Sequence, residues 1–231
     1  ATEAYRALET ANQARALLEA GFTTVREVGS ETAVALARAI EDGYVSGPRM
    51  LAAGRVIMRT GGPWPGRPRA RAVEGVDECR RAVHLLVREG ASLIKIGTSA
   101  YRDSRRDHLF GEVPTFTVEE IRAVVSEAHK WGLRVAAHCA GTLAVRNAVK
   151  GGVDSVEHAF NIDEETIRLI VDAGVWVFPT LRFTKAHLQS LSWAEETYRQ
   201  QLTSLRALHE AGASIAMGSD STGGPRLLHG T

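Results

Sequence analysis

The stretch GASLIKIGTS, residues 90–99, decides how this chain folds. Its centre, from Leu93 to Ile96, has the branched apolar composition of a strand buried in a sheet. Lys95 nevertheless stands in the middle of this strand. Burying an ammonium group among Leu and Ile side chains is costly unless the group is paired, shifted in pKa or chemically altered. The sequence therefore raises the question of what Lys95 does there.

The segments on either side of this stretch alternate between strand-like and helix-like patterns. A helical pattern ends at glycine and a strand begins about two residues later in EAGFTTV, REGASLI, KGGVDSV, DAGVWVF and EAGASIA. Such alternation predicts a parallel sheet, and its regular repeat favours an α/β fold of the (β/α)8 TIM-barrel type over an open doubly wound sheet. We expect a single domain over residues 1–231, with strands over 23–29, 49–57, 92–98, 134–139, 155–159, 175–181 and 214–220.

The bulk properties of the chain exclude several classes of partner. Its 231 residues suit one α/β barrel, and its formal net charge of +1 gives no sign of a nucleic-acid or anionic-membrane partner. The sequence holds no run of 18 or more apolar residues, so it predicts no membrane-spanning helix. Two cysteines, Cys79 and Cys139, make no disulfide framework, and we expect a reducing compartment, the cytoplasm by default.

Polar residues stand at the carboxyl-terminal ends of several predicted strands. Parallel barrel strands end on one face, where the loops converge and active sites lie. Because alternate residues of a strand share a face, we expect these side chains to point inward together with Leu93, Ala136, Val156 and Gly218. The polar residues are Lys95, His138, His158 and Asp220.

Two imidazoles and a carboxylate suit zinc, which lowers the pKa of a bound water to about 7. A free ammonium at Lys95 would repel a metal ion. A lysine that has reacted with carbon dioxide is instead a carbamate, an anion with two oxygens that can bridge two metals. A carbamate would also explain why Lys95 is tolerated in a buried strand.

Short phrases spread over almost the whole chain carry a family resemblance: GFTTVREVG, GPRMLAAGRVI, TGG, GASLIKI, AAHCAG, GGVDSVEHAF and MGSDS. In their order and spacing, the sequence resembles the amidohydrolase superfamily, and within it the Xaa-Pro dipeptidase and imidazolonepropionase-like group. The resemblance implies that Lys95 is carboxylated and bridges two zinc ions. It further implies that His138 and His158 bind the more exposed metal. Asp220 would bind the buried metal and serve as proton shuttle.

The chain departs from the family pattern at both ends. The family opens with a His-x-His pair on strand one and folds its chain ends into a small β-sandwich, whereas the first histidine here is His84. We therefore expect barrel strands two to eight, without strand one and the sandwich. The complete family site holds two zinc ions. With only Lys95, His138 and His158 complete, we expect one zinc per chain, and two bound metals would refute this.

Other residues are weaker candidates for substrate contacts: Arg26, Tyr101, His108 and Arg146. Arg26 could bind a substrate carboxylate, or it could pair with Glu27 or Asp220. We expect the histidines within helical patterns to be surface or packing residues, namely His84, His129, His187 and His209. Trp131 and Trp176 are expected in the core.

The expected function is zinc-dependent hydrolysis of an amide bond in a small substrate, by a dipeptidase or carboxypeptidase of the Xaa-Pro or N-acyl amino acid type. A cyclic-amide hydrolase or deaminase of the same superfamily would share every metal ligand. In another class, Lys95 would form a Schiff base in a lyase, or its head would reach solvent through the barrel mouth. An inactive fragment also stays open, and the unpaired edges of an incomplete barrel make a homo-oligomer plausible.

Overall fold

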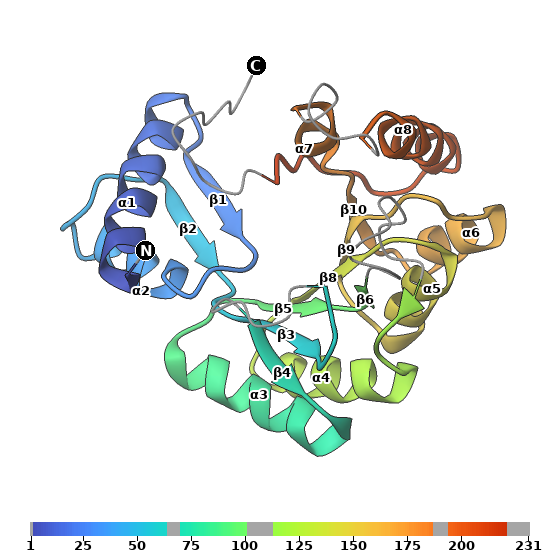
Figure 1. Ribbon diagram of the computed structural model, residues 1–231, viewed down its shortest axis with the longest axis horizontal. Helices are drawn as coiled ribbons and strands as arrows, with labels where there is room; N and C mark the ends of the chain where they lie inside the picture. Colours follow the sequence, from blue (N-terminus) through green and yellow to red (C-terminus); the bar gives the residue numbers. More distant parts are fainter. Residues whose placement is uncertain (1, 64–69, 101–112, 187–193, 221–231) are drawn as a thin grey trace.

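The computed structural model describes residues 2–63, 70–100, 113–186 and 194–220, in which strands and helices alternate (Figure 1). The helices are α1 (Glu3–Glu19), α2 (Ala33–Glu41), α3 (Gly75–Glu89), α4 (Val118–Lys130), α5 (Thr142–Gly151), α6 (Glu164–Asp172), α7 (Leu181–Ala186) and α8 (Ala194–Glu210). The strands are β1 (Thr24–Glu27), β2 (Arg49–Ala52), β3 (Val56–Arg59), β4 (Ala70–Val73), β5 (Ile94–Gly97), β6 (Ser99–Ala100), β7 (Val113–Pro114), β8 (Val135–Cys139), β9 (Ser155–His158) and β10 (Trp176–Phe178).

The strand that holds Lys95, β5, lies inside a parallel sheet of order β10-β9-β8-β5-β3-β4. The strands β1 and β2 form a separate parallel pair. This pair is joined to the segment before β5, because the backbone N–H of Ser92 donates to the carbonyl of Ala52 in β2 at 2.9 Å. At the other end, Val177 of β10 bridges Ile215. In Figure 1 the strands curve round a common centre with the helices outside them. The predicted α/β fold of the TIM-barrel type is confirmed for this part of a barrel.

The prediction of one strand over 49–57 is wrong, because the structure divides it into β2 and β3. The division falls at Gly54, whose φ of 68° lies in the left-handed region that glycine adopts without strain. There the backbone leaves β1, the partner of β2, and joins β5 and β4, the partners of β3. The change of partner depends on the neighbouring strands, which this segment of sequence does not show.

Short elements also differ from the prediction. Within the described residues, the predicted strand over 214–220 forms one isolated bridge, between Val177 and Ile215. The strands β4, β6 and β7 and the helix α7 were not predicted, since elements of two to six residues show little periodicity.

The two tryptophans that were expected in the core are half-exposed, at 57% for Trp131 and 50% for Trp176. Trp131 caps the carboxyl end of α4, and Trp176 is the first residue of β10. A residue at the end of an element is covered by neighbours on one side only, so these large rings reach solvent.

The predicted glycine stops at the helix ends are confirmed where they are clearest. Gly90 and Gly152 end α3 and α5 in the left-handed conformation, with φ of 94° and 89°. Each lets the chain reverse into the following strand within a few residues. In the described ranges, no helix is both long and apolar enough to cross a membrane.

Alternate residues of the strands face two different environments. Ile94 and Ile96 are fully buried in a large core between the sheet and the helices. Leu93 belongs instead to a small separate cluster with Ala53 and Ala136 on the inner side. Burying each isoleucine stabilises the fold by about 1.5–3 kcal/mol, so the register of β5 is strongly specified. Lys95, between the two isoleucines, is thereby forced inward.

Candidate active site

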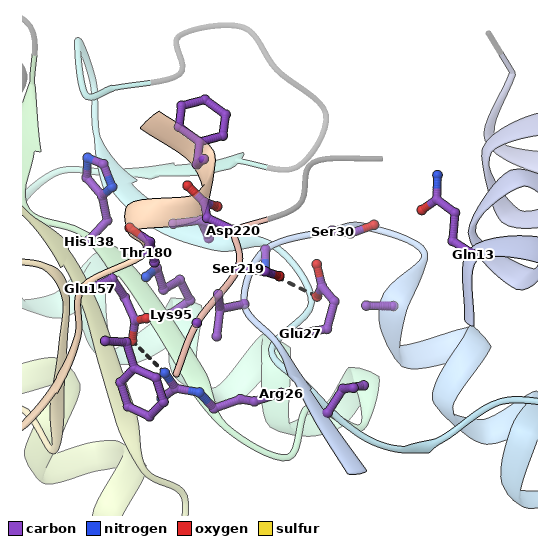
Figure 2. Close-up of a pocket in the computed structure, with 18 of the residues that line it drawn as sticks. Gln13, Arg26, Glu27, Ser30, Lys95, His138, Glu157, Thr180, Ser219 and Asp220 are labelled. Carbon is purple, nitrogen blue, oxygen red and sulfur yellow. Dashed lines mark hydrogen bonds and ion pairs between the residues drawn. The ribbon is translucent and has the colours of Figure 1, made fainter. Parts of the chain in front are cut away.

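The carboxyl-terminal ends of the strands surround a cavity of about 610 Å³. All four residues predicted to form a metal site line this cavity. They are Lys95 of β5, His138 of β8, His158 of β9, and Asp220, which stands five residues after the bridge at Ile215. Figure 2 shows Lys95, His138 and Asp220 around it, together with Glu157. The structure thus brings together side chains that are up to 125 residues apart in the sequence, from Lys95 to Asp220.

Lys95 is buried, with only 3% of its surface exposed. Burial lowers its pKa because the charged form is poorly solvated, and the nearby carboxylate of Glu157 opposes this shift. The amine is therefore biased toward its neutral form. A neutral amine is the form that can attack an electrophilic carbon.

The two histidines lie against each other in an edge-to-face arrangement, with their ring centroids 4.6 Å apart. Burial lowers the pKa of His158 to about 3, and the positive charge of Lys95 adds to the shift. The Nδ1 atom of His158 lies 2.6 Å from the hydroxyl oxygen of Thr180, which orients the ring. His158 is therefore neutral at physiological pH, and neutral imidazole is the form that binds a metal.

The direction of His158 does not follow from the alternation that the sequence analysis used. In β9 it is Glu157 that lies in register with His138 and faces inward, whereas Val156 packs into the outer core. The placement of Val156 on the inner face was therefore wrong. His158 has a φ of 75°, a left-handed conformation that is uncommon for a residue other than glycine. This local turn of the backbone brings its side chain to the cavity.

Glu157 is a residue of the cavity that the sequence analysis missed. It is 4% exposed, and its Oε1 accepts a hydrogen bond from Nη2 of Arg26 at 2.7 Å. Arg26 also donates from Nη1 to the hydroxyl oxygen of Ser155 at 2.9 Å, and its guanidinium lies 3.8 Å from the ring centroid of Phe178. An alternation counted from Ser155 would have found Glu157.

The partner of Arg26 also differs from the two that were expected. The ion pair that fixes its guanidinium joins it to Glu157, which is 131 residues away, instead of to Glu27 or Asp220. Arg26 nevertheless lines the cavity, so a substrate contact for this residue stays a prediction.

Among the other candidates for substrate contacts, Arg146 is described by the structure and does not line the cavity. Arg146 of α5 donates from Nε to Thr166 at 2.8 Å and from Nη2 to Asp163 at 2.7 Å, so it joins α5 to the start of α6. Its substrate contact stays a prediction. Tyr101 and His108 lie outside the described residues.

The donor set fits a metal ion in part. His138 and His158 offer two adjacent imidazoles, a common half of a zinc site. In the ranges that the structure describes, however, no three His, Cys, Asp or Glu side chains are arranged to hold a metal. A further ligand of another type is needed, and an oxygen donor carried by Lys95 would supply it.

This part of a parallel α/β barrel carries a lysine, two histidines and an aspartate around one cavity, the residues that the family resemblance predicted. The chain belongs to the Amidohydrolase family, whose sequence model matches residues 2–230. Members of this family are generally metal-dependent. The resemblance that the sequence analysis stated is therefore confirmed.

A curated relative and two solved structures are similar to this chain over most of its length. The ochratoxinase of Aspergillus niger is 30% identical over 244 residues, which cover 91% of this chain and 50% of the relative. The crystal structure of an Xaa-Pro dipeptidase with bound methionine matches with a TM-score of 0.85 and 32% identity, over 95% of this chain and 60% of that one. A prolidase complexed with N-methylphosphonate-L-proline matches with a TM-score of 0.83 and 30% identity, over 96% and 60%. The chain thus spans about half the length of the ochratoxinase and three fifths of these structures.

Proposed function

We propose that the protein hydrolyses an amide bond in a small substrate, as a dipeptidase or carboxypeptidase of the Xaa-Pro or N-acyl amino acid type. The observation that carries this proposal is the convergence of Lys95, His138, His158 and Asp220 on one cavity. Its volume of about 610 Å³ lies within the range of sites for small ligands. The similarity to an Xaa-Pro dipeptidase, a prolidase and an ochratoxinase supports the reaction class.

The proposal includes one or two zinc ions, held by His138, His158 and a carboxylated Lys95, with Asp220 as a further ligand. Two observations support this set: His158 is neutral because its pKa is about 3, and burial lowers the pKa of Lys95. Only the neutral amine of Lys95 can attack carbon dioxide to form a carbamate. Bound zinc would polarise a carbonyl oxygen and lower the pKa of a water to about 7.

In this proposal Asp220 moves the proton that the reaction requires. As a water oxygen adds to the scissile carbonyl carbon, the carboxylate of Asp220 takes one proton from that water. When the carbon–nitrogen bond breaks, Asp220 gives this proton to the leaving nitrogen, which departs as an amine. Asp220 lines the same cavity as Lys95 and both histidines, which is what such a shuttle needs.

The buried amine of Lys95, whose pKa is lowered by burial, also favours a second candidate, a lyase in which Lys95 forms a Schiff base with a carbonyl substrate. The two candidates respond differently to reagents. Borohydride in the presence of substrate would trap a Schiff base covalently on Lys95, and a chelator would not affect the reaction. Amide hydrolysis would show the opposite pattern.

The test is a hydrolysis assay of the full-length protein, with Xaa-Pro dipeptides and N-acyl amino acids, combined with elemental analysis of its metal content. We expect zinc to co-purify and chelation to abolish hydrolysis. Replacing His138 with Asn should remove both zinc and activity. The matched control is His209→Asn, because His209 is exposed on α8 and does not line the cavity.

An active protein that retains full activity without metal would sink the proposal, as would a His138→Asn variant that behaves like the His209→Asn control. Four expectations from the sequence stay predictions: one domain over residues 1–231, a cytoplasmic location, self-association, and the absence of nucleic-acid or membrane partners.

A further inference from the structure

An ion pair crosses the interior of the barrel beside Lys95. Arg26 extends from β1, and its partners Glu157 and Ser155 belong to β9. The register places Ser155 beside Ala136 and Ala136 beside Lys95, so the contact between Arg26 and Ser155 lies at the level of Lys95. This side-chain bridge joins two strands that are not neighbours in the sheet.

The bridge is built as one unit. The Oε1 atom of Glu157 accepts hydrogen bonds from Arg26 at 2.7 Å and from the hydroxyl of Ser155 at 3.2 Å. Phe178 of β10 covers the guanidinium at 3.8 Å. Because Glu157 and Ser155 are each only 4% exposed, removing one partner would leave the other polar group buried without its contact.

Glu157 also occupies a special place among the predicted metal ligands. It directly precedes His158 in the chain, and it lies in register with His138 on the neighbouring strand. Fixing the side chain of Glu157 therefore fixes the backbone from which His158 projects. It also fixes the edge of β9 against which the backbone of His138 is paired.

We propose that Arg26 and Glu157 are positioning residues, whose ion pair holds Lys95, His138 and His158 in the arrangement that binds the metal. This inference rests on the proposed function, since it assigns a role in the same site. The pair acts through geometry, by joining β1 to β9 across the interior, and neither residue is itself a ligand.

A purely electrostatic role would have a different signature. Carboxylation would convert Lys95 from a neutral or positive group into an anion, which Arg26 would attract and Glu157 would repel. If only charge mattered, Arg26→Gln would weaken zinc binding and Glu157→Gln would strengthen it. If the bridge positions the ligands, both substitutions weaken zinc binding.

The experiment measures the affinity of the full-length, metal-free protein for Zn²⁺, by competition with a chromophoric chelator in bicarbonate buffer. We expect Arg26→Gln and Glu157→Gln each to lower the affinity by about tenfold, the size of effect that supporting residues have at metal sites. The double variant should be no weaker than either single variant, because both remove the same bridge.

Two milder substitutions keep the test valid if those variants do not fold. Ser155→Ala leaves both charges in place and removes the hydrogen bonds to Arg26 and Glu157, so it should weaken zinc binding in the same direction by a smaller factor. Arg26→Lys keeps the charge but not the two-pronged contact, and should do the same. The matched control is Arg71→Gln, which breaks a 2.7 Å ion pair with Glu89 away from the cavity and should leave zinc affinity unchanged.

Tighter zinc binding by Glu157→Gln would overturn the inference in favour of a simple charge effect. Additive losses in the double variant would overturn it as well, as would wild-type affinity in both Ser155→Ala and Arg26→Lys. These outcomes require a wild-type protein that binds zinc. If the wild type binds none, the proposed function itself fails and the inference falls with it.

Discussion

Mild acidification of the metal-free protein tests how strongly the site excludes charge from His158. Burial, aided by the positive charge of Lys95, lowers the pKa of His158 from 6.5 to about 3. As the pH falls below 6.5, the unfolded chain therefore takes up a proton that the folded protein does not bind until near pH 3. The contribution of His158 to stability is complete above pH 6.5 and is lost as the pH falls toward 3.

The expected loss of stability follows from the difference between pH 5 and the ordinary histidine pKa of 6.5. Each pH unit between the two pKa values changes the free energy of unfolding by about 1.4 kcal/mol, so at pH 5 His158 should have cost about 2 kcal/mol of stability. Carboxylates titrate lower. Burial raises the pKa of Asp154 and Glu120, but their hydrogen bonds and the neighbouring charges outweigh it and leave both pKa values lowered. The difference between the wild type and a His158 variant over the window from pH 7 to pH 5 thus isolates this histidine.

The assay is urea unfolding of the chelator-treated protein at pH 7 and at pH 5, for the wild type and for His158→Gln. We expect the wild type to lose about 2 kcal/mol more than the variant between these pH values. His209→Gln, at an exposed position on α8, should behave as the wild type does. Equal losses in the wild type and in His158→Gln would show that His158 is solvated, and would refute the reasoning.

Three further substitutions test other parts of the structure. Thr180→Val removes the hydroxyl that lies 2.6 Å from Nδ1 of His158, and chelator competition should show a loss of Zn²⁺ affinity of about tenfold. Ile96→Ala opens a cavity at a fully buried position, and urea unfolding should show a loss of about 2–5 kcal/mol. Gly151→Ala would place its Cβ 2.2 Å from Cγ2 of Ile121, so thermal unfolding should show destabilisation of about 1–3 kcal/mol, although alanine is the better helix former. A rise in melting temperature for Gly151→Ala would contradict this contact.

The inward position of Lys95 was predictable because short-range physics decides it. Ile94 and Ile96 gain the most by packing against the helices, and a strand has only two faces. The same reasoning placed His138 correctly, since its neighbour Ala136 lies on the inner side. Where a strand stays regular up to its polar residue, the alternation of its residues predicts the face of the sheet on which that side chain lies.

The pairing of Arg26 was not predictable in the same way. Its two candidate partners in the sequence analysis were Glu27, its neighbour in the chain, and Asp220, which was predicted at the same mouth, whereas the structure pairs it with Glu157, 131 residues away. Which carboxylate meets a guanidinium across a barrel depends on the order and stagger of all the strands between them. The order and stagger of the strands depend on the whole fold, so they cannot be predicted from the residues around Arg26 alone.

The backbone at the strand ends is the part of the site that an alternating pattern cannot describe. In the described ranges, four of the five residues other than glycine that have positive φ end or follow β9 or β10, and the fifth follows the bridge at Ile215: His158, Ala159, Asn161, Thr180 and Asp220. Such conformations cost of order 1–3 kcal/mol each and persist where surrounding contacts impose them. Their concentration beside the cavity aims His158 and Thr180 at each other, at 2.6 Å, in a way that regular strands would not allow. Two of the four candidate site residues, His158 and Asp220, thus stand where the backbone departs from the alternating pattern.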